Sequence, residues 1–254
     1  MRSINHQMRY YSGKNRIGTT IEKELVKIKE QHTNVNFEGY LEPFCGSLGV
    51  FKHMTKHFDK CFATDGNEDI IMLWNAVKDK TFEEPFMTKE LYRDLKKTIA
   101  PSALKAYAGF ACSFLGTWFG SYIEEDDHKR YQSVMKNHSQ IQNAQFDSKC
   151  YQELESKVAA GNYFIYCDPP YKNTTCAFGP IKDTKKNTKF DSEEFWIIME
   201  RWRSYGNVVV VSEFNAPANW TCVWSKIRSK KVNNSKTKSK SPTDNKVFEE
   251  KLFV

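Results

Sequence analysis

The sequence predicts an α/β fold in which the strands of one sheet alternate with crossover helices. An apolar strand at 37–41 leads into a glycine-containing turn and a helical pattern, and a second short strand at 61–64 is followed by Asp65. A third apolar run, 163–167, is followed by Asp168. Ligands of open α/β sheets bind at the carboxyl ends of the strands, so these two acidic residues mark a candidate site.

The spacing of apolar residues predicts the other elements in chain order. An amphipathic helix is expected over 19–29, and helical spacing recurs over 48–58 and 67–78. Phe195, Met199 and Trp202 share one face of a later helix, which favours core packing for them over base stacking. A strand at 208–212 follows, and a terminal hairpin is expected from 221–224 and 247–254, with its last strand antiparallel at the sheet edge.

The sequence Asp168-Pro169-Pro170-Tyr171 suits attack by an aromatic exocyclic amine, whose lone pair is delocalised into its ring. The Asp168 carboxylate and the Pro169 carbonyl can accept the two amine protons and so localise the lone pair on nitrogen. The prolines restrict φ, and the Tyr171 ring offers a flat surface for a flipped-out base. Asp-Pro is also common in ordinary turns, and its position after a buried strand is what favours the chemical role.

A second candidate site is the turn in Glu42-Pro43-Phe44-Cys45-Gly46. A strand, a glycine turn and a helix N-terminus together form a cradle for a nucleotide-type ligand. Asp65 lies nineteen positions after Gly46, the spacing at which an acidic residue reaches ribose hydroxyls in dinucleotide folds. Without that acidic residue, the turn would equally be an ordinary connection between a strand and a helix.

These blocks, together with Tyr10-Tyr11-Ser12-Gly13-Lys14, resemble the Dam-type DNA adenine methyltransferases of the D12 class. That family has an aromatic-x-Gly-Gly-Lys loop, a Glu-Pro-Phe-x-Gly block, an acid after the second strand and Asp-Pro-Pro-Tyr, in this order. The runs 190–196, 208–212 and 249–254 are similar to its later helix and strands. The resemblance implies a Rossmann-like S-adenosylmethionine-dependent methyltransferase fold with a mixed sheet and an inserted, mainly helical target-recognition domain.

The resemblance also assigns the site residues. The catalytic residues are expected to be Asp168, Pro169, Pro170 and Tyr171, and S-adenosylmethionine is expected to contact Tyr10, Lys14, Phe44, Gly46, Asp65 and Asp168. Phe44 and Tyr10 would lie against the cofactor, and Asp65 would hold its ribose hydroxyls. An ammonium group does not suit a sulfonium, so Lys14 is assigned to the cofactor's carboxylate or to bound DNA. Neither a metal ion nor a covalent protein intermediate is expected.

The sequence departs from the family pattern at three places. Ser12 stands where a glycine is usual in the first loop, and Leu48 stands where a second glycine often occurs in the cofactor turn. A leucine there would crowd the backbone against the ligand, because glycine is what permits close approach. The segment 109–120 lacks the Arg- and Asn-containing signature of the best-known members, so their DNA sequence preference is not transferred.

The chain is expected to divide into a catalytic and cofactor-binding domain, 1–80 with 151–254, and a target-recognition insertion, 81–150. A purely structural helical insertion is the alternative for 81–150. Residues 225–246 carry eight Lys or Arg and one acid among Ser, Thr and Asn, which predicts a mobile hairpin tip. Contact with the DNA backbone and a merely solvated loop both remain open for it.

Composition agrees with a polyanion partner. The net charge is +7 and the sequence pI is near 8.9, which suits double-stranded DNA. The seven cysteines show no zinc-ligand spacing, which predicts reduced thiols, and no apolar run is long enough to span a bilayer. We expect no membrane partner, favour a monomer, and expect a cytoplasmic location in a bacterial or virus-infected host cell.

The predicted function is site-specific transfer of a methyl group from S-adenosylmethionine to the N6 amine of adenine in DNA, with base flipping. A phage or restriction–modification context fits this activity. The alternatives are a catalytically weak DNA-binding accessory protein of the same fold, and an amino-methyltransferase acting on RNA or on cytosine N4. An Asn in place of Asp168 would have favoured protein amides, and a Ser would have favoured cytosine.

Overall fold

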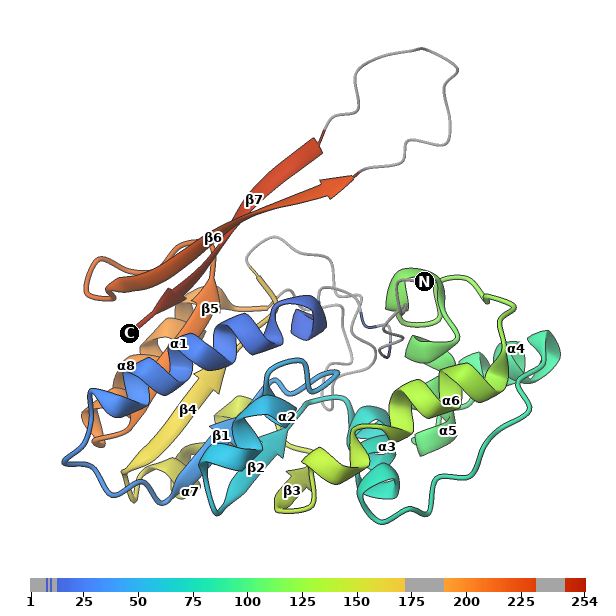
Figure 1. The fold of residues 1–254 in the computed structure, drawn as a ribbon, viewed down its shortest axis with the longest axis horizontal. Helices are drawn as coiled ribbons and strands as arrows, with labels where there is room; N and C mark the ends of the chain where they lie inside the picture. Colours follow the sequence, from blue (N-terminus) through green and yellow to red (C-terminus); the bar gives the residue numbers. More distant parts are fainter. Residues whose placement is uncertain (1–7, 9, 11–12, 172–189, 232–244) are drawn as a thin grey trace.

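A seven-stranded mixed sheet organises the fold, in the order β3-β2-β1-β4-β5-β7-β6 (Figure 1). The computed structural model describes residues 8, 10, 13–171, 190–231 and 245–254, with side chains described outside 228–248. Neighbouring strands from β3 to β5 are parallel, and β7 is antiparallel to both β5 and β6. The strands are β1 Gly39–Glu42, β2 Cys61–Thr64, β3 Ala144–Asp147, β4 Tyr163–Cys167, β5 Val208–Glu213, β6 Cys222–Lys231 and β7 Asn245–Phe253.

Helices cover both faces of the parallel part of the sheet (Figure 1). Side chains of β4 alternate between the two sides: Phe164 and Tyr166 join the core that contains α1, α2 and α3, whereas Ile165 joins the core that contains α7 and α8. The helices are α1 Gly18–Glu30, α2 Phe51–Met54, α3 Glu68–Lys78, α4 Lys89–Lys97, α5 Ala103–Ala106, α6 Asp127–Met135, α7 Glu155–Val158 and α8 Ser192–Ser204.

Several predicted elements are confirmed, with local reasons for their ends. The strands at 61–64 and 163–167 have the expected bounds. The Asn67 side chain caps α3 by accepting from the Ile70 amide, and Asp191 caps α8. Phe195, Met199 and Trp202 are buried in the core beneath α8, so their predicted packing role is confirmed.

Two sequence predictions are wrong. The helix expected over 48–58 is only the four-residue α2, which continues as a 3₁₀ turn at Thr55–His57. Leu48 has a φ of 57°, which lies outside the right-handed helical region, so the helix starts after it. The last strand is not at the sheet edge, because β7 pairs with β5 on one side and with β6 on the other, and β6 forms the edge.

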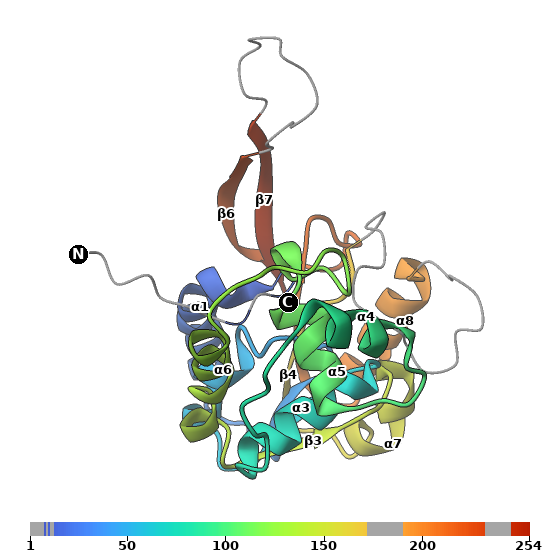
Figure 2. The ribbon, with the colours of Figure 1, turned by 90° about the vertical axis from the view of Figure 1, so that its right-hand side faces the viewer.

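The segment 81–150 packs beside the sheet, with α4, α5 and α6 facing the viewer in Figure 2. Its buried aromatic residues, including Tyr107 and Phe110, share one hydrophobic cluster with α1–α3. A buried ion pair joins it to α3, with Lys105 Nζ 3.4 Å from an Asp69 carboxylate oxygen. Its last strand, β3, pairs with β2, so this end of the segment belongs to the central sheet.

The β6–β7 hairpin projects away from the body of the molecule (Figures 1 and 2). Strand β5 pairs with β7 only at 251–253, whereas β6 and β7 pair with each other out to Lys231 and Asn245. The strands therefore extend into the segment 225–246 that was predicted to be a mobile loop, and the remaining part, 232–244, lies outside the described residues.

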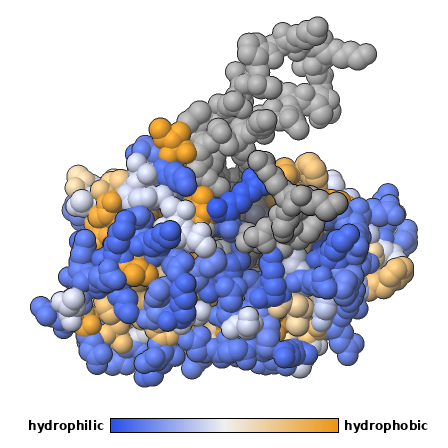
Figure 3. Space-filling model, in the orientation of Figure 1, coloured by the Kyte–Doolittle hydropathy of each residue, from blue (hydrophilic) through white to orange (hydrophobic). Residues whose placement is uncertain are grey.

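On the face shown in Figure 3, the coloured residues are mostly hydrophilic, with apolar side chains in small separate areas. Among the residues that the structure describes, no helix is long and apolar enough to cross a membrane.

Candidate active site

The site lies where the carboxyl ends of β1 and β4 meet. Helix α2, which comes after β1, packs in the core on one face of the sheet, and α8, which comes after β4, packs in the core on the other. Ligands of open α/β sheets usually bind at this position, outside the carboxyl ends of the strands. Glu42 ends β1, Asp65 follows β2 and Asp168 follows β4, so three carboxyl groups gather at this edge.

Asp65 holds the glycine turn after β1. One carboxylate oxygen accepts from the Gly46 amide at 3.0 Å and the other accepts from the Asn67 amide at 2.9 Å. The Trp74 indole donates to the Gly46 carbonyl at 2.7 Å, which fixes the turn from below. Burial raises the pKa of Asp65 to about 6, although the two amide donors oppose that rise.

Gly46 adopts a left-handed conformation with a φ of 41°, and an added Cβ would lie 3.0 Å from the Tyr10 ring. Gly46, Asp65 and Tyr10, each of which the sequence analysis assigned to the cofactor site, therefore lie together in the fold. The helix N-terminus that was expected beside Gly46 is absent from this place, because α2 begins only at Phe51. The turn itself, and not a helix end, forms this part of the site.

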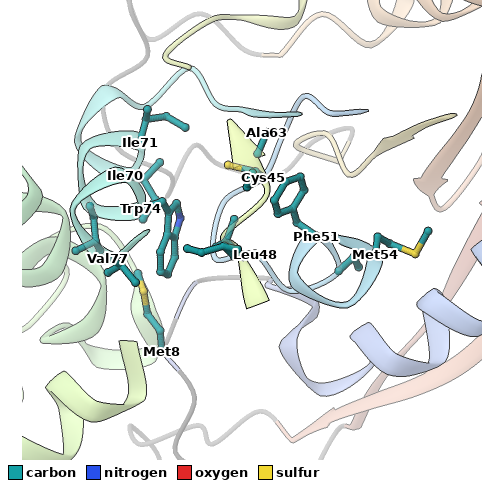
Figure 4. Packing of buried hydrophobic residues seen from close by; sticks show 14 of the residues in the cluster. Met8, Cys45, Leu48, Phe51, Met54, Ala63, Ile70, Ile71, Trp74 and Val77 are labelled. Atoms are coloured by element: carbon teal, nitrogen blue, oxygen red, sulfur yellow. The ribbon is translucent and has the colours of Figure 1, made fainter. Parts of the chain in front are cut away.

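Leu48 is the residue that departs from the usual glycine. It is also left-handed, with a φ of 57°, and its side chain is completely buried. Figure 4 shows this side chain pointing towards Trp74 in the hydrophobic core below the turn. The extra carbon atoms of the leucine therefore fill the core and do not lie on the ligand side of the turn.

The N-terminal loop packs against the same turn. The Gly13 amide donates to the Tyr10 carbonyl at 3.1 Å, and the Tyr10 ring lies 4.5 Å from the Phe110 ring. The Asn15 side chain donates to Ser47 Oγ at 3.0 Å and accepts from Lys52 Nζ at 2.8 Å. These contacts turn Lys14, which begins a 3₁₀ turn at Lys14–Arg16, into the interior.

Lys14 binds protein groups around Asp168. Its ammonium nitrogen lies 2.8 Å from Asp168 Oδ1, 2.6 Å from the Tyr171 hydroxyl and 3.3 Å from Glu250 Oε1. An ammonium group has three protons, and these three partners use all of them. The geometry thus favours Lys14 as the charge partner of Asp168 over the predicted contact with the cofactor's carboxylate or with DNA.

Two further residues of this site, Ser212 and Glu250, were missed from the sequence. Ser212 Oγ donates to Glu250 Oε1 at 2.6 Å, and the Tyr171 hydroxyl donates to the same carboxylate. Glu250 and Leu252 occupy the buried side of β7, while Glu249 and Lys251 pair with each other on the other side at 3.3 Å. The sequence signal that could have found Glu250 is its spacing: it lies two residues before Leu252, and alternate residues of a strand lie on the same side.

The acids of the site differ in their pKa directions. Burial raises the pKa of Asp168, against the opposing charge of Lys14. The pKa of Glu250 is lowered: burial would raise it, but Lys14, Ser212 and Tyr171 stabilise the charged form more. Glu42 accepts from the Tyr40 hydroxyl at 2.7 Å, and burial raises its pKa well above the usual range.

Phe44 lies on the other side of the sheet edge from Tyr10. Its ring centroid is 5.3 Å from that of Tyr151 and 5.9 Å from that of Phe195, within the aromatic cluster above α8. Pro169 is buried, and Pro170 and Tyr171 are partly exposed. Phe214 packs edge-on against the Tyr171 ring at 4.6 Å, which restrains the ring from one side.

These residues fit a cationic, ribose-containing cofactor. The acidic side chains of Asp65, Asp168 and Glu250 outnumber the single ammonium of Lys14, so the site favours a ligand with a positive charge. Each Asp65 oxygen has spare acceptor capacity for hydroxyl groups beyond its one amide donor. Gly46 keeps the turn free of a side chain.

Comparison with known proteins gives the family. A family model described as "D12 class N6 adenine-specific DNA methyltransferase" matches residues 13–111 and 113–218. The chain belongs to this family. No curated protein matches the sequence. The matched range contains Lys14, Gly46, Asp65, Asp168 and Tyr171, and the mixed α/β sheet of this methyltransferase is compatible with a methyltransferase fold.

Proposed function

We propose that this enzyme transfers a methyl group from S-adenosylmethionine to the N6 amine of adenine at a specific site in double-stranded DNA. The observation that carries the proposal is the placement of Asp168. Its carboxylate follows β4, next to the strand β1 that leads into the Gly46 turn, and it binds the same Lys14 ammonium as the Tyr171 hydroxyl. Family membership supports DNA adenine over the RNA and cytosine alternatives.

Asp168 would act on the target amine. Lys14 occupies one position on its carboxylate, and the remaining lone pairs can accept an amine proton. The Pro169 carbonyl would accept the second amine proton, and Tyr171 would stack on the extruded base. The raised pKa of Asp168 makes its carboxylate a stronger hydrogen-bond acceptor, provided that the pH keeps it ionised. Activity should therefore fall as the pH drops through that pKa.

The cofactor would lie between the Gly46 turn and Asp168. When bound, S-adenosylmethionine supplies the electrophilic methyl group. Asp65 would accept from the ribose hydroxyls, and Tyr10 and Phe44 would flank the cofactor from opposite faces of the sheet. The Gly46 turn would approach the cofactor with its backbone, because it carries no side chain there.

The 81–150 segment would provide target recognition. Its turn at Phe114–Gly116 exposes Phe114 and Leu115, with exposed fractions of 59% and 58%. Ring contacts connect this turn to the cofactor side of the site, through Trp118, Phe110 and Tyr10, at centroid distances of 4.8 and 4.5 Å. Apolar side chains at such a tip can wedge between base steps and unstack the target base.

The β6–β7 hairpin would contact DNA phosphates. The part of the hairpin that pairs with nothing else in the described chain carries four basic residues in β6, at 226, 228, 230 and 231, and Lys246 in β7. Residues 225–246 carry eight Lys or Arg and one acid, a composition that suits the phosphates of a DNA backbone. Such contacts add affinity without sequence information.

Replacing Asp168 tests the proposal. In Asp168→Asn, the amide keeps the shape but presents donors to the amine, so methyl transfer to DNA should fall by about 10²-fold or more. Asp168→Ala should have the same effect. Calorimetry with S-adenosylmethionine should show that both variants still bind the cofactor. Near-normal transfer of a radiolabelled methyl group by either variant would refute the role, and an inactive wild-type enzyme would support the accessory-protein alternative.

A further inference from the structure

Glu250 is the most deeply buried acid next to the catalytic carboxylate. Its side chain is 1% exposed, compared with 19% for Asp168 and 5% for Lys14. It comes from β7, the antiparallel strand that follows the projecting hairpin, whereas Asp168 follows β4. An ionised carboxylate in this position costs desolvation energy and persists only with several donors around it.

Three donors meet that requirement. Lys14 Nζ, Ser212 Oγ and the Tyr171 hydroxyl all bind Glu250 Oε1. Two of them are the same groups that shape the reaction site: Lys14 also binds Asp168, and the Tyr171 ring is the proposed base platform. Lys14 is thus shared between two carboxylates, and the Tyr171 hydroxyl is held between Lys14 and Glu250.

We propose that Glu250 is a positioning residue of this methyltransferase: it holds Lys14 and the Tyr171 hydroxyl in place, so that Asp168 receives only part of the lysine's charge and the Tyr171 ring keeps one orientation. The inference rests on the proposed role of Asp168. It adds a residue that does not touch the substrate but sets how strongly Asp168 accepts a proton or a hydrogen bond.

The charge of Glu250 affects the pKa of Asp168, because both carboxylates bind the same Lys14 ammonium and therefore lie close together. A negative charge on Glu250 repels the ionised form of Asp168, and its share of Lys14 weakens the opposing attraction. Both effects keep the pKa of Asp168 raised, and a carboxylate of higher pKa accepts more strongly from a poorly basic amine. The other titratable groups that face Asp168 are Glu42, Tyr10, Tyr166, Cys167 and Tyr171. Burial raises the pKa of each of these groups, which favours the neutral form of the tyrosines, of Cys167 and of Glu42.

The two charges next to Asp168 therefore predict opposite pH effects. Glu250→Gln removes the repelling charge and leaves Lys14 to Asp168 alone, so the acidic limb of the kcat–pH profile should move to lower pH by about half a unit or more. Lys14→Met removes the attracting charge, so the same limb should move to higher pH. A purely structural role for Glu250 would leave the limb in place.

The plateau rate supplies a second readout. In Glu250→Gln, we expect kcat to fall about tenfold, with the Kd for S-adenosylmethionine changed by less than about threefold, since the lost effect acts on the amine and on the base platform. Ser212→Ala removes one donor to Glu250 without changing charge, and should lower kcat in the same direction by a smaller factor. It is also the variant to use if Glu250→Gln fails to fold.

Glu249→Gln is the matched control. It makes the same chemical change one residue away, on the solvent side of β7. It should leave kcat and the pH profile unchanged. The inference is overturned if Glu250→Gln folds and keeps the wild-type acidic limb and kcat, or if its limb moves to higher pH. An active Asp168→Ala would instead refute the proposed role of Asp168, so the two failures are distinguishable.

Discussion

Leu48 provides a quantitative test of the cofactor turn. It is fully buried against Trp74, yet it has a φ of 57°, a conformation that costs a residue with a Cβ about 1–2 kcal/mol. Leu48→Ala keeps this conformational cost and loses the packing, which should lower the free energy of unfolding by about 2–5 kcal/mol. Leu48→Gly loses the same packing but removes the conformational cost.

We predict the difference in the free energy of unfolding between these two variants. Glycine normally destabilises a helix or strand by about 0.5–1 kcal/mol relative to alanine. At position 48 the relief of the left-handed strain is larger, so Leu48→Gly should be more stable than Leu48→Ala by about 0.5–1 kcal/mol. Leu25 is the matched control, since it is equally buried but lies inside the helix α1. There the glycine variant should be the less stable one, by about 1 kcal/mol.

Urea denaturation followed by circular dichroism measures all four variants. If glycine is worse than alanine at position 48 as it is at position 25, the left-handed turn is refuted. The same proteins test the sequence-based expectation that Leu48 crowds the ligand. Because its side chain points into the core, the Kd for S-adenosylmethionine of Leu48→Gly should stay within about threefold of wild type. A much tighter Kd would restore the crowding interpretation.

The other predictions concern ligands. Asp65→Asn should weaken S-adenosylmethionine binding by about 1.5–3 kcal/mol in calorimetry, since it loses a charged acceptor of ribose hydroxyls; unchanged affinity would mean that the ribose lies elsewhere. Wild-type affinity should also fall below about pH 6, because protonation of Asp65 competes with those hydrogen bonds, and this pH dependence should vanish in the Asn variant. Phe114→Ala combined with Leu115→Ala should reduce the fluorescence increase of 2-aminopurine at the target base, whereas Ile99→Ala, at a 96% exposed site of the same segment, should not; equal effects would reject the wedge. Five hairpin lysines can be changed to Gln together: Lys230 and Lys231 in β6, and Lys236, Lys238 and Lys240 in the part outside the described residues. This change should weaken DNA binding and flatten the dependence of the binding constant on salt concentration, without altering the methylated sequence. An unchanged salt dependence would reject phosphate contact.

The local sequence predicted the elements whose signal is contained in a few neighbouring residues. The strands at 61–64 and 163–167 are short apolar runs with polar ends, and α3 follows the apolar spacing of 67–78, so the period was sufficient. The same signals placed Asp65 and Asp168 at strand ends. The order of motifs then indicated the family that the comparison shows.

The tertiary structure decided what depends on contacts between distant segments. Lys14 and Glu250 are joined across nearly the whole chain, and only the placement of β7 between β5 and β6 brings Glu250 to Asp168. The short α2 and the conformation of Leu48 likewise follow from how the N-terminal loop and Trp74 pack against the Gly46 turn. Apolar spacing encodes which side chains are buried, but a buried ion pair depends on which strands become neighbours, and that is fixed only when the sheet assembles.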